Sequence, residues 1–436
     1  MIKDGGDGDD LLRGVFGTPP ATETPSLLDR LERDHRWFER RLAARLDPYQ
    51  RCVTTAIGPR VRGHFRNGQP FSGINFAAQD YLSLTRHPRI IRAGRRALHT
   101  YGSHSAGPMQ SGGLHPLAIE LEHALAAFLG YADVTVTTLG WLAGYAAVTA
   151  LVGPDDIVLL DSRSNSCLFA NARSAGGRVE TYRHCSTADA QRMLESLRAS
   201  NPDAGILLIT EAIFPTCSDM PDIAALQRLC RSHGASLMVD VSTDLGAWGE
   251  RGGGQLQDQY LRGKVDVVVG TFSNTFAALG GFVASNSAAL KTHIRCSPGP
   301  ATQTSGIPPI QAATALEALA VVDSREGDER REMLKHNVLY ARYRLAAAGF
   351  ELGGSCSPSI PVKLGQSDFA RLATREIIEL GGIVNLLEFP TVPPESCRWR
   401  LSMMADHSEA DIDEFVVKAA LARNRAKLAL ESYERD

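Results

Sequence analysis

Acidic side chains that could take part in catalysis stand at the ends of short apolar runs in this sequence. Asp161, Glu211 and Asp240 each close such a run, and a loop follows a further run at Gly270. Runs that are apolar throughout predict strands buried on both faces of a sheet. Because ligand groups collect at the carboxyl ends of parallel strands, we predict a functional site at that edge of the sheet.

Amine and thiol chemistry depends on few residues. An imine-forming amine has to come from one of the seven lysines, which are Lys3, Lys264, Lys291, Lys335, Lys363, Lys418 and Lys427. The eight cysteines are scattered without a CxxC pair, which suggests neither a zinc site nor a disulfide framework. Cys167 and Cys217 could be acylated as nucleophiles, although a single cysteine without a neighbouring base is usually inert.

The elements that position these residues alternate along the chain from about residue 86. Helical stretches separate the β-branched runs VTVTT (134–138), IVLLD (157–161), ILLITE (206–211), SLMVD (236–240) and VDVVVGTF (265–272). This alternation predicts a doubly wound α/β sheet. Helical stretches near 309–346, 367–381 and 408–430, with the run RWRLSMM, predict a smaller α+β domain after it.

We predict four segments. Residues 1–25 combine Gly, Asp, Pro and Thr and are expected to form a flexible leader. Residues 26–85 should hold a helix and an irregular segment, with Ser26 as the N-cap and one apolar side formed by Leu27, Leu28, Leu31, Trp37 and Leu42. Residues 86–310 should form the large α/β domain, and residues 311–436 a linking helix and a small C-terminal α+β domain.

Composition excludes several classes of protein. The chain has 436 residues and a formal net charge of -3, without a basic run of the kind that a phosphate backbone attracts. The acidic, Gly-rich N-terminus MIKDGGDGDD lacks the apolar core of a signal peptide, and no stretch reaches about 18 apolar residues. We therefore expect no nucleic-acid partner, no membrane association and a cytoplasmic location.

The order of several longer blocks closely resembles the α-oxoamine synthases, pyridoxal-phosphate enzymes of fold type I. The blocks are NFAAQDYLSLTRHPRI, YGSHSAGPMQSGGLHPLAIELEHALAAFLG, VDVSTDLGAWGERG, GTFSNTFAALGGF, QTSGIPP and FPTVPPESCRWRLSMMADHSEADID. The resemblance covers about residues 74–425. It implies a homodimer or a related heterodimer, with an active site between subunits, that joins an amino acid to an acyl thioester with loss of carbon dioxide.

The residues expected to hold the cofactor depart from the family's pattern. The motif that carries the imine-forming lysine ends here in Asn274, whose delocalised amide nitrogen cannot form an imine. The histidine that touches the cofactor is Thr243, and the histidine that stacks on the pyridine ring is Asn165. The arginine of the glycine-rich segment is Met109, whereas Arg400, matching the arginine that clamps the substrate carboxylate, remains. We therefore expect no covalent cofactor and leave pyridoxal phosphate in doubt.

Asp240 is the main survivor of the implied site. In the family this carboxylate pairs with the pyridine nitrogen; alternatively, it is an inherited fold residue bonded to hydroxyls such as that of Ser242. His104 stands where the family has glycine and is our candidate general base, against the alternative of a surface residue. The remaining candidates are Thr271, Ser273, Thr304 and Ser305 at phosphate positions, Trp141 near the cofactor pocket or in the core, and His115 and His407 in supporting or substrate-binding positions.

Three functions stay open at this stage. The first is an acyltransferase that moves an acyl group from a CoA or acyl-carrier-protein thioester to a nucleophile without an internal aldimine, independently of pyridoxal phosphate. The second is a non-catalytic partner of a lysine-bearing homologue. The third is an enzyme that binds pyridoxal or pyridoxamine phosphate non-covalently on Asp240.

Overall fold

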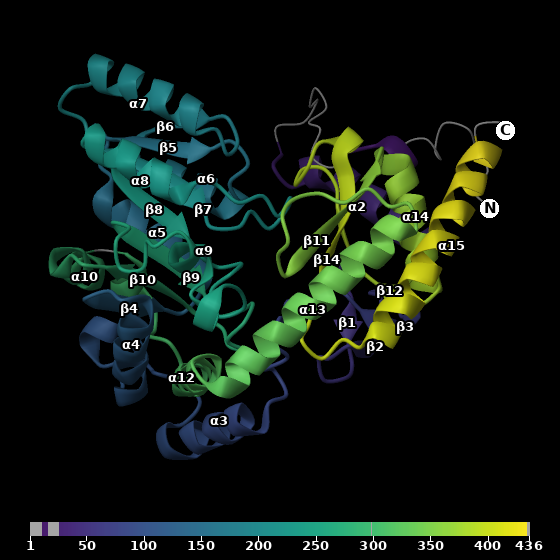
Figure 1. Cartoon of the computed structure of the whole chain (residues 1–436), viewed down its shortest axis with the longest axis horizontal. Helices are drawn as coiled ribbons and strands as arrows, with labels where there is room; N and C mark the ends of the chain where they lie inside the picture. Colours follow the sequence, from purple (N-terminus) through teal and green to yellow (C-terminus); the bar gives the residue numbers. More distant parts are fainter. Residues whose placement is uncertain (1–10, 16–25, 298, 434–436) are drawn as a thin grey trace. The chain divides into compact units, whose positions relative to one another are not determined.

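The computed structural model describes residues 11–15, 26–297 and 299–433, and divides the chain into two compact units (Figure 1). One unit comprises residues 79–335; the other combines the chain up to residue 78 with residues 336 onward. We had placed the boundaries of the large domain at 86 and 310. They differ because the helix Pro309–Val322 packs against the helices Pro88–Tyr101 and Pro116–Leu129, and the Tyr81 N–H donates to the Asn274 carbonyl.

The expected flexible leader is only partly covered by the description. Residues 1–10 and 16–25 lie outside the described residues. Leu11 and Leu12 are buried, and Arg371 Nη1 donates hydrogen bonds to their carbonyl oxygens at 3.1 and 2.7 Å. The prediction of a flexible leader is therefore wrong for residues 11–15, because two apolar side chains and a buried guanidinium fix them.

A seven-stranded mixed sheet forms the centre of the unit spanning residues 79–335, in the order β4-β10-β9-β8-β7-β5-β6. The strands are β4 (Asp133–Thr137), β5 (Ile157–Asp161), β6 (Arg178–Tyr182), β7 (Ile206–Glu211), β8 (Ser236–Asp240), β9 (Val267–Thr271) and β10 (Gly281–Ser285). Strands β5 to β9 pair in parallel, and β10 runs antiparallel to β4 and β9. The predicted fold class is confirmed.

The helices of this unit precede β4, connect the strands from β4 to β9, and follow β10. They are α3 (Pro88–Tyr101), α4 (Pro116–Leu129), α5 (Gly140–Leu151), α6 (Ser166–Ser174), α7 (Thr187–Ser200), α8 (Ile223–Ser232), α9 (Gly254–Asp258), α10 (Ala288–Cys296), α11 (Pro300–Gln303) and α12 (Pro309–Val322). Short 3-10 turns lie at η1 (Met109–Ser111) and η2 (Glu250–Gly252). β5 and β7 are buried at every residue, as expected for central strands of a parallel sheet. Because they pair in parallel, their carboxyl ends lie side by side.

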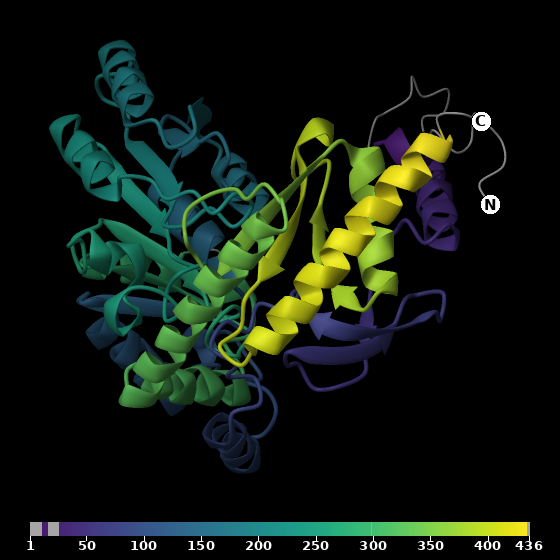
Figure 2. The same cartoon turned by 45° about the vertical axis from the view of Figure 1, so that its right-hand side comes forward.

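The other unit contains two small sheets and long helices. Its strands β1 (Cys52–Val53), β2 (Arg60–His64), β3 (Pro70–Asn75) and β12 (Gly382–Ile383) form one sheet, and β11 (Ser359–Gly365), β14 (Cys397–Ser402) and β13 (Asn385–Leu387) form another. Its helices are α2 (Asp29–Ala43), α14 (Ser367–Glu379) and α15 (Glu409–Tyr433), with η3 (Pro394–Ser396). Helices α14 and α15 pack against each other (Figure 2). Helix α13 (Arg325–Ala347) crosses the boundary between the units.

The start of helix α2 corrects two expectations. The helix begins at Asp29 after Leu28, so Ser26 is not its N-cap, although the Ser26 hydroxyl accepts the Asp29 N–H at 3.3 Å. Trp37 and Leu42 are buried as expected, whereas the side chains that precede and open the helix, Leu27, Leu28 and Leu31, are 75%, 76% and 59% exposed.

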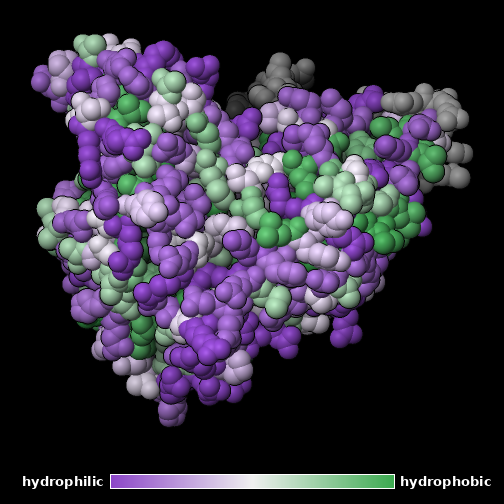
Figure 3. Space-filling view, in the orientation of Figure 1, coloured by the Kyte–Doolittle hydropathy of each residue, from purple (hydrophilic) through white to green (hydrophobic). Residues whose placement is uncertain are grey.

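Apolar residues are also exposed on helix α15. They are Val417, Leu421 and Leu428 at 66%, 41% and 67% exposure, and Figure 3 shows apolar surface over this helix. Positions four and seven apart lie on one side of a helix. No helix among the described residues is both long enough and apolar enough to span a membrane.

Candidate functional site

Asp240 occupies the carboxyl end of β8, near the middle of the large sheet. Its Oδ1 accepts a hydrogen bond from the Ser242 N–H at 2.8 Å. Burial raises the pKa of Asp240, and the hydrogen bonds from Ser242 partly oppose that rise. No salt bridge joins Asp240 to a cation among the described residues. A desolvated carboxylate without a cationic partner is suited to a positively charged or proton-bearing ligand.

Asn274 lies on the next loop, after β9, and its side chain is tied to the loop after β8. Asn274 Nδ2 donates to the carbonyl oxygen of Ser242 at 2.8 Å, and its own carbonyl accepts the Tyr81 N–H at 3.3 Å. The predicted neighbours Asp240 and Asn274 are therefore brought together through Ser242. The side-chain amide of Asn274 thus links the loop after β9 to the loop after β8.

The predicted phosphate-contacting hydroxyls bond to one another. Thr271 Oγ1 donates to the carbonyl of Gly280 at 3.1 Å, lies 3.0 Å from Ser273 Oγ, and accepts the Ser273 N–H at 3.2 Å. Ser273 is exposed, whereas Thr243, in the loop after β8, is buried. Of the two hydroxyl residues that follow Gly270, Thr271 and Ser273, Ser273 is the more exposed.

The glycine-rich loop packs against the segment around Gly306. Ser105 Oγ donates to the carbonyl of Gly306 at 2.7 Å. A Cβ on Gly113 would lie 1.6 Å from the carbonyl oxygen of Gly107, so this close approach requires glycine. Met109 and Thr304, together with Ser305, line one small cavity of about 10 Å³, large enough for about one water molecule.

His104, our candidate general base, is an exposed residue of this loop. Its Nδ1 accepts the Ala106 N–H at 2.9 Å, which orients the ring. This bond favours a local structural role for Nδ1 and leaves the catalytic assignment a prediction.

Asn165 and Trp141, both predicted to lie near the cofactor, are at the starts of helices α6 and α5. Asn165 is exposed and caps α6, with its Oδ1 accepting the Cys167 N–H at 3.2 Å, while its own N–H donates to Glu211 Oε1 at 2.6 Å. Trp141, at the start of α5, is 52% exposed, so the alternative of ordinary core packing is wrong for it. Burial and the nearby Asp240 charge raise the pKa of Glu211, despite the hydrogen bond from Asn165.

His115 and His407, the histidines predicted in supporting or substrate-binding positions, have both ring nitrogens within hydrogen-bonding distance of main-chain groups. His115 caps α4 through Nδ1, which accepts the Ala118 N–H at 3.3 Å, and Nε2 lies 2.8 Å from the carbonyl of Ile307. His407 is buried between the Met404 N–H and the carbonyl of Asn75. These contacts support the structural alternative for both and oppose a substrate-binding role for His115.

Arg400, the predicted carboxylate clamp, lies on β14 in the unit that contains residues 336–433. Its Nε is buried and lacks a hydrogen-bond partner among the described residues. A buried guanidinium N–H without an acceptor is costly, so it fits an anionic ligand such as a carboxylate.

Sequence reasoning missed a cluster around His184, at the β6 side of the same sheet edge. His184 Nδ1 lies 2.7 Å from Asp161 Oδ1, and Nε2 lies 3.0 Å from Asp219 Oδ2 and 3.7 Å from Cys217 Sγ. Burial lowers the pKa of His184, but hydrogen bonds to Asp161, Cys185 and Cys217 outweigh it and raise the pKa to about 12. The signal that could have found this group is His184-Cys185 following the missed strand β6.

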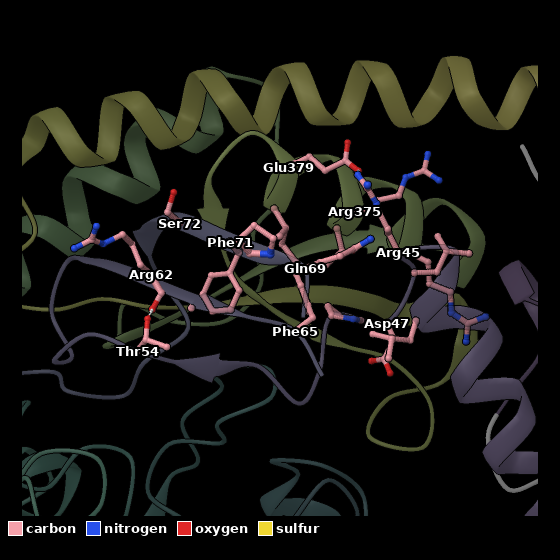
Figure 4. A pocket seen from close by; sticks show the side chains of 18 of the residues that line it. Arg45, Asp47, Thr54, Arg62, Phe65, Gln69, Phe71, Ser72, Arg375 and Glu379 are labelled. Atoms are coloured by element: carbon pink, nitrogen blue, oxygen red, sulfur yellow. Dashed lines mark hydrogen bonds and ion pairs between the residues drawn. The ribbon is translucent and has the colours of Figure 1, made fainter. Parts of the chain in front are cut away.

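A larger cavity lies in the other unit (Figure 4), with a volume of about 710 Å³. Its lining joins basic and aromatic side chains, including Arg45, Arg62, Phe65, Phe71 and Arg375. None of the site residues predicted from the sequence is among those that line it. We therefore place the candidate site at the sheet edge around Asp240.

Sequence comparisons assign the chain to a family. The model for aminotransferase class I and II matches residues 72–418. The chain belongs to this family. It is 31% identical to a serine palmitoyltransferase of Sphingobacterium spiritivorum, over 81% of this chain and 88% of the relative. It is also 31% identical to a putative 8-amino-7-oxononanoate synthase of Caulobacter vibrioides, over 81% and 89%. These relatives match the α-oxoamine synthases, as the resemblance implied.

Solved structures agree with this assignment. A serine palmitoyltransferase described with its pyridoxal-phosphate internal aldimine has a TM-score of 0.86 and 26% identity, covering 92% of this chain and 99% of that one. The Sphingomonas wittichii enzyme gives the same TM-score, identity and coverage. A lysine-to-alanine variant from S. paucimobilis, also at 0.86 and 26%, holds a pyridoxal-phosphate–myriocin aldimine.

These structures overturn our expectation about the cofactor. We expected none held covalently and left pyridoxal phosphate in doubt, but a similar solved structure carries it as an internal aldimine. That expectation rested on the residues at four positions that depart from the family's pattern, which are Asn274, Thr243, Asn165 and Met109. The cofactor is also present in the lysine-to-alanine variant, there as an aldimine with myriocin.

Proposed function

We propose that this chain is an acyl-transferring α-oxoamine synthase that moves an acyl group from a CoA or carrier-protein thioester to an amino-group substrate. Asp240 would hold the ring of pyridoxal phosphate, and Asn274 occupies the position where the family has its imine-forming lysine. The observation that carries the proposal is the desolvated Asp240 carboxylate, which lacks a cationic partner among the described residues.

Asp240 fits the ring of this cofactor. A protonated pyridine nitrogen supplies the positive charge that the carboxylate lacks, and the Ser242 N–H fixes Oδ1 at 2.8 Å so that the carboxylate is already oriented. Ser273 and Thr304 are exposed hydroxyl residues on the loops after β9 and before α12, and we assign them to the phosphate.

Two of the three lysines in the same unit, Lys264 and Lys291, support the assignment of Asn274. Lys291 pairs with Glu122 and Asp133 at 3.4 and 3.2 Å, and Asp133 begins β4, at the end opposite to the Thr137–Gly281–Thr271 row. Lys264 precedes β9, whose far end carries Thr271. Both lysines therefore lie at the ends of β4 and β9 that are opposite to the loop that contains Asn274.

The bound cofactor would supply an electron sink for the substrate's α-carbon. The chain's own residues then bind and orient the reactants. Asn274 holds the loops after β8 and β9 together, and Arg400, with its unpaired Nε, is assigned to the carboxylate of the amino substrate. His104 is the proposed proton acceptor from the glycine-rich loop.

Asn274 also favours a second candidate, a non-catalytic partner of a lysine-bearing homologue. Such a subunit would need the fold and a contact surface but no covalent link to the cofactor. The exposed apolar residues Val417, Leu421 and Leu428 on one side of α15 are compatible with pairing of chains. We propose a dimer in either case.

The test combines cofactor binding with thioester turnover. Purified chain is titrated with pyridoxal phosphate, followed by absorbance, and free CoA is measured during incubation with acyl-CoA and amino acids. We expect the chain to bind the cofactor and to release CoA only when the cofactor is present. Asp240→Asn should lose about 10-fold or more in cofactor affinity, because the amide cannot pair with a protonated pyridine nitrogen and a hydrogen bond to a charged group contributes about 1.5–3 kcal/mol. Asp203→Asn, an exposed carboxylate on the same unit, is the control.

The outcomes separate the two candidates. Cofactor that remains attached after borohydride treatment and denaturation would contradict the assignment of Asn274. An inactive chain that becomes active only when mixed with a lysine-bearing homologue would support the partner subunit instead.

A further inference from the structure

The cluster around His184 combines the side chains that bind zinc-class cations. Its members come from three neighbouring strand ends: Asp161 from β5, His184 and Cys185 after β6, and Cys217 and Asp219 after β7. One ligand atom from each of His184, Cys217 and Asp219 lies within 4.8 Å of the others. These residues come from three separate segments of the sequence. A search for closely spaced ligands such as a CxxC pair therefore does not find them.

We propose that His184 Nε2, Cys217 Sγ and Asp219 Oδ2 form a binding site for a zinc-class divalent cation. Zinc bonds of about 2.3 Å to sulfur and 2.0–2.1 Å to nitrogen or oxygen, at tetrahedral angles, put sulfur about 3.5 Å and oxygen about 3.3 Å from the nitrogen. The corresponding separations here are 3.7 and 3.0 Å. Small side-chain movements would therefore complete the geometry.

Asp161 prepares the imidazole for this role. It is fully buried, and its Oδ1 lies 2.7 Å from His184 Nδ1, which places the proton on Nδ1 and directs Nε2 toward Cys217 and Asp219. A carboxylate on the far nitrogen of a metal-binding histidine fixes its tautomer and orientation in the same way. Phe214 packs edge-on against the ring at 4.6 Å between centroids, which restricts its rotation.

Access and charge are compatible with a cation. The Asp219 side chain is 35% exposed and that of His184 is 14% exposed, so an ion can reach the group from solvent. Arg163 Nη1 competes only weakly for Asp219, at 3.9 Å and with its own side chain 59% exposed. When the ion binds, bonds from the metal to nitrogen, sulfur and oxygen form, and the thiol proton of Cys217 and any proton on Nε2 leave to solvent.

Cys185 also approaches the His184 ring, with its Sγ 3.8 Å from Nδ1. Its Sγ lies 3.6 Å from Nε2, but it groups with Asp161 and His184, not with Cys217 and Asp219. Its backbone has φ 50°, a conformation that L residues rarely adopt, and its N–H donates to Asp161 Oδ2 at 2.7 Å. We therefore assign three protein ligands and leave the fourth position open, as in catalytic zinc sites.

Metal analysis of the full chain tests the site. Chelator-treated, reduced protein is dialysed against Zn²⁺, bound metal is counted by mass spectrometry, and Co²⁺ is added separately to record thiolate-to-metal absorption. We expect one ion per chain and a cobalt–thiolate band. Cys217→Ser should remove both, Asp219→Asn should weaken binding, and Asp161→Asn should weaken it about 10- to 100-fold.

Matched controls keep the result interpretable. Cys296→Ser removes an exposed cysteine elsewhere, and Cys185→Ser removes the nearby thiol outside the assigned set; both should retain the ion. Thermal unfolding without metal checks that each variant folds, and Asp219→Asn stands in for Cys217→Ser if the latter does not. Zinc that is absent from the native chain, or that is lost in Cys185→Ser and kept in Cys217→Ser, would overturn the assignment.

Discussion

Asn274 Nδ2 donates a hydrogen bond to the carbonyl oxygen of Ser242 at 2.8 Å. The bond joins the loop after β9 to the loop after β8, directly beside the Asp240 carboxylate, to which the Ser242 N–H donates. The side chain at this position thus has a fixed structural partner. The hydrogen bond gives the Asn274 amide a structural role. Replacing this residue by lysine tests whether the site can form a covalent link to the cofactor.

Asn274→Lys should give the site a covalent link to pyridoxal phosphate. An amine at this position can form an imine, whereas the amide cannot. We expect borohydride treatment to fix the cofactor to residue 274 of the variant, detected as a modified peptide after proteolysis, and to leave the corresponding wild-type peptide unmodified. Loss of the Ser242 bond should cost about 1 kcal/mol of stability.

Asn274→Gln is the control for that change, because it keeps an amide without supplying an amine. It should yield no modified peptide. Failure of the lysine variant to form the link in a folded, cofactor-binding protein would argue that the loop after β9 does not face the cofactor.

His407 should make the free energy of unfolding depend on pH below neutrality. Burial lowers its pKa to about 4, below the usual value near 6.5, since the ring is enclosed beside Phe76. The unfolded state therefore binds the proton more tightly, and the contribution is complete above about pH 6.5 and lost as pH falls toward 4. Between pH 7 and pH 5 we expect a loss of about 2 kcal/mol.

Urea denaturation at several pH values measures this effect. The difference in the free energy of unfolding between wild type and His407→Asn should change by about 2 kcal/mol between pH 7 and pH 5, even if the variant is less stable overall. His293→Asn, an exposed histidine, should leave the slope unchanged. An unaltered slope in His407→Asn would show that another group titrates.

The sequence was sufficient for those parts of the fold that depend on apolar periodicity. β5, β7 and β8 are buried almost throughout, so their β-branched runs stand out. β6 escaped because it is an edge strand whose residues are largely accessible, and its letters RVETY mix charges with apolar residues.

The missed edge strand also explains what was missed at the site. Asp240 and Asn274 could be placed together because both follow predicted strands in the middle of the sheet. His184 follows β6, so without that strand nothing brought it to Asp161 and Cys217. Contacts such as the Asn274–Ser242 bond depend on loop conformations that composition and periodicity do not specify.

Asp244 should produce a pH dependence of opposite sign to that of His407. Burial raises its pKa to about 7, against the hydrogen bond that the Gln255 N–H donates to Oδ2 at 2.7 Å, and Oδ1 is buried without a partner among the described residues. The folded state binds the proton more tightly, so stability is greatest below about pH 4 and declines as pH rises to 7. From pH 5 to 7 the decline should be about 2 kcal/mol.

Asp244→Asn isolates this contribution, because an amide of similar shape does not titrate. The free energy of unfolding of the variant should fall less than that of wild type between pH 5 and 7, measured by urea denaturation. Parallel pH profiles for the two proteins would contradict the assigned rise in pKa. The exposed Asp203→Asn provides the matched comparison.

Gly113→Ala should distort the glycine-rich loop near Met109 and Thr304. The new Cβ would lie 1.6 Å from the Gly107 carbonyl oxygen, so main chain would have to move, and overpacking of this kind costs about 1–3 kcal/mol. Gly107→Ala is the control, since its Cβ would meet nothing closer than 3.7 Å. We expect thermal unfolding and cofactor affinity to suffer in the first variant alone. Equal tolerance of both substitutions would mean that the loop is not held against Gly306 as described, and that its glycines do not shape the site.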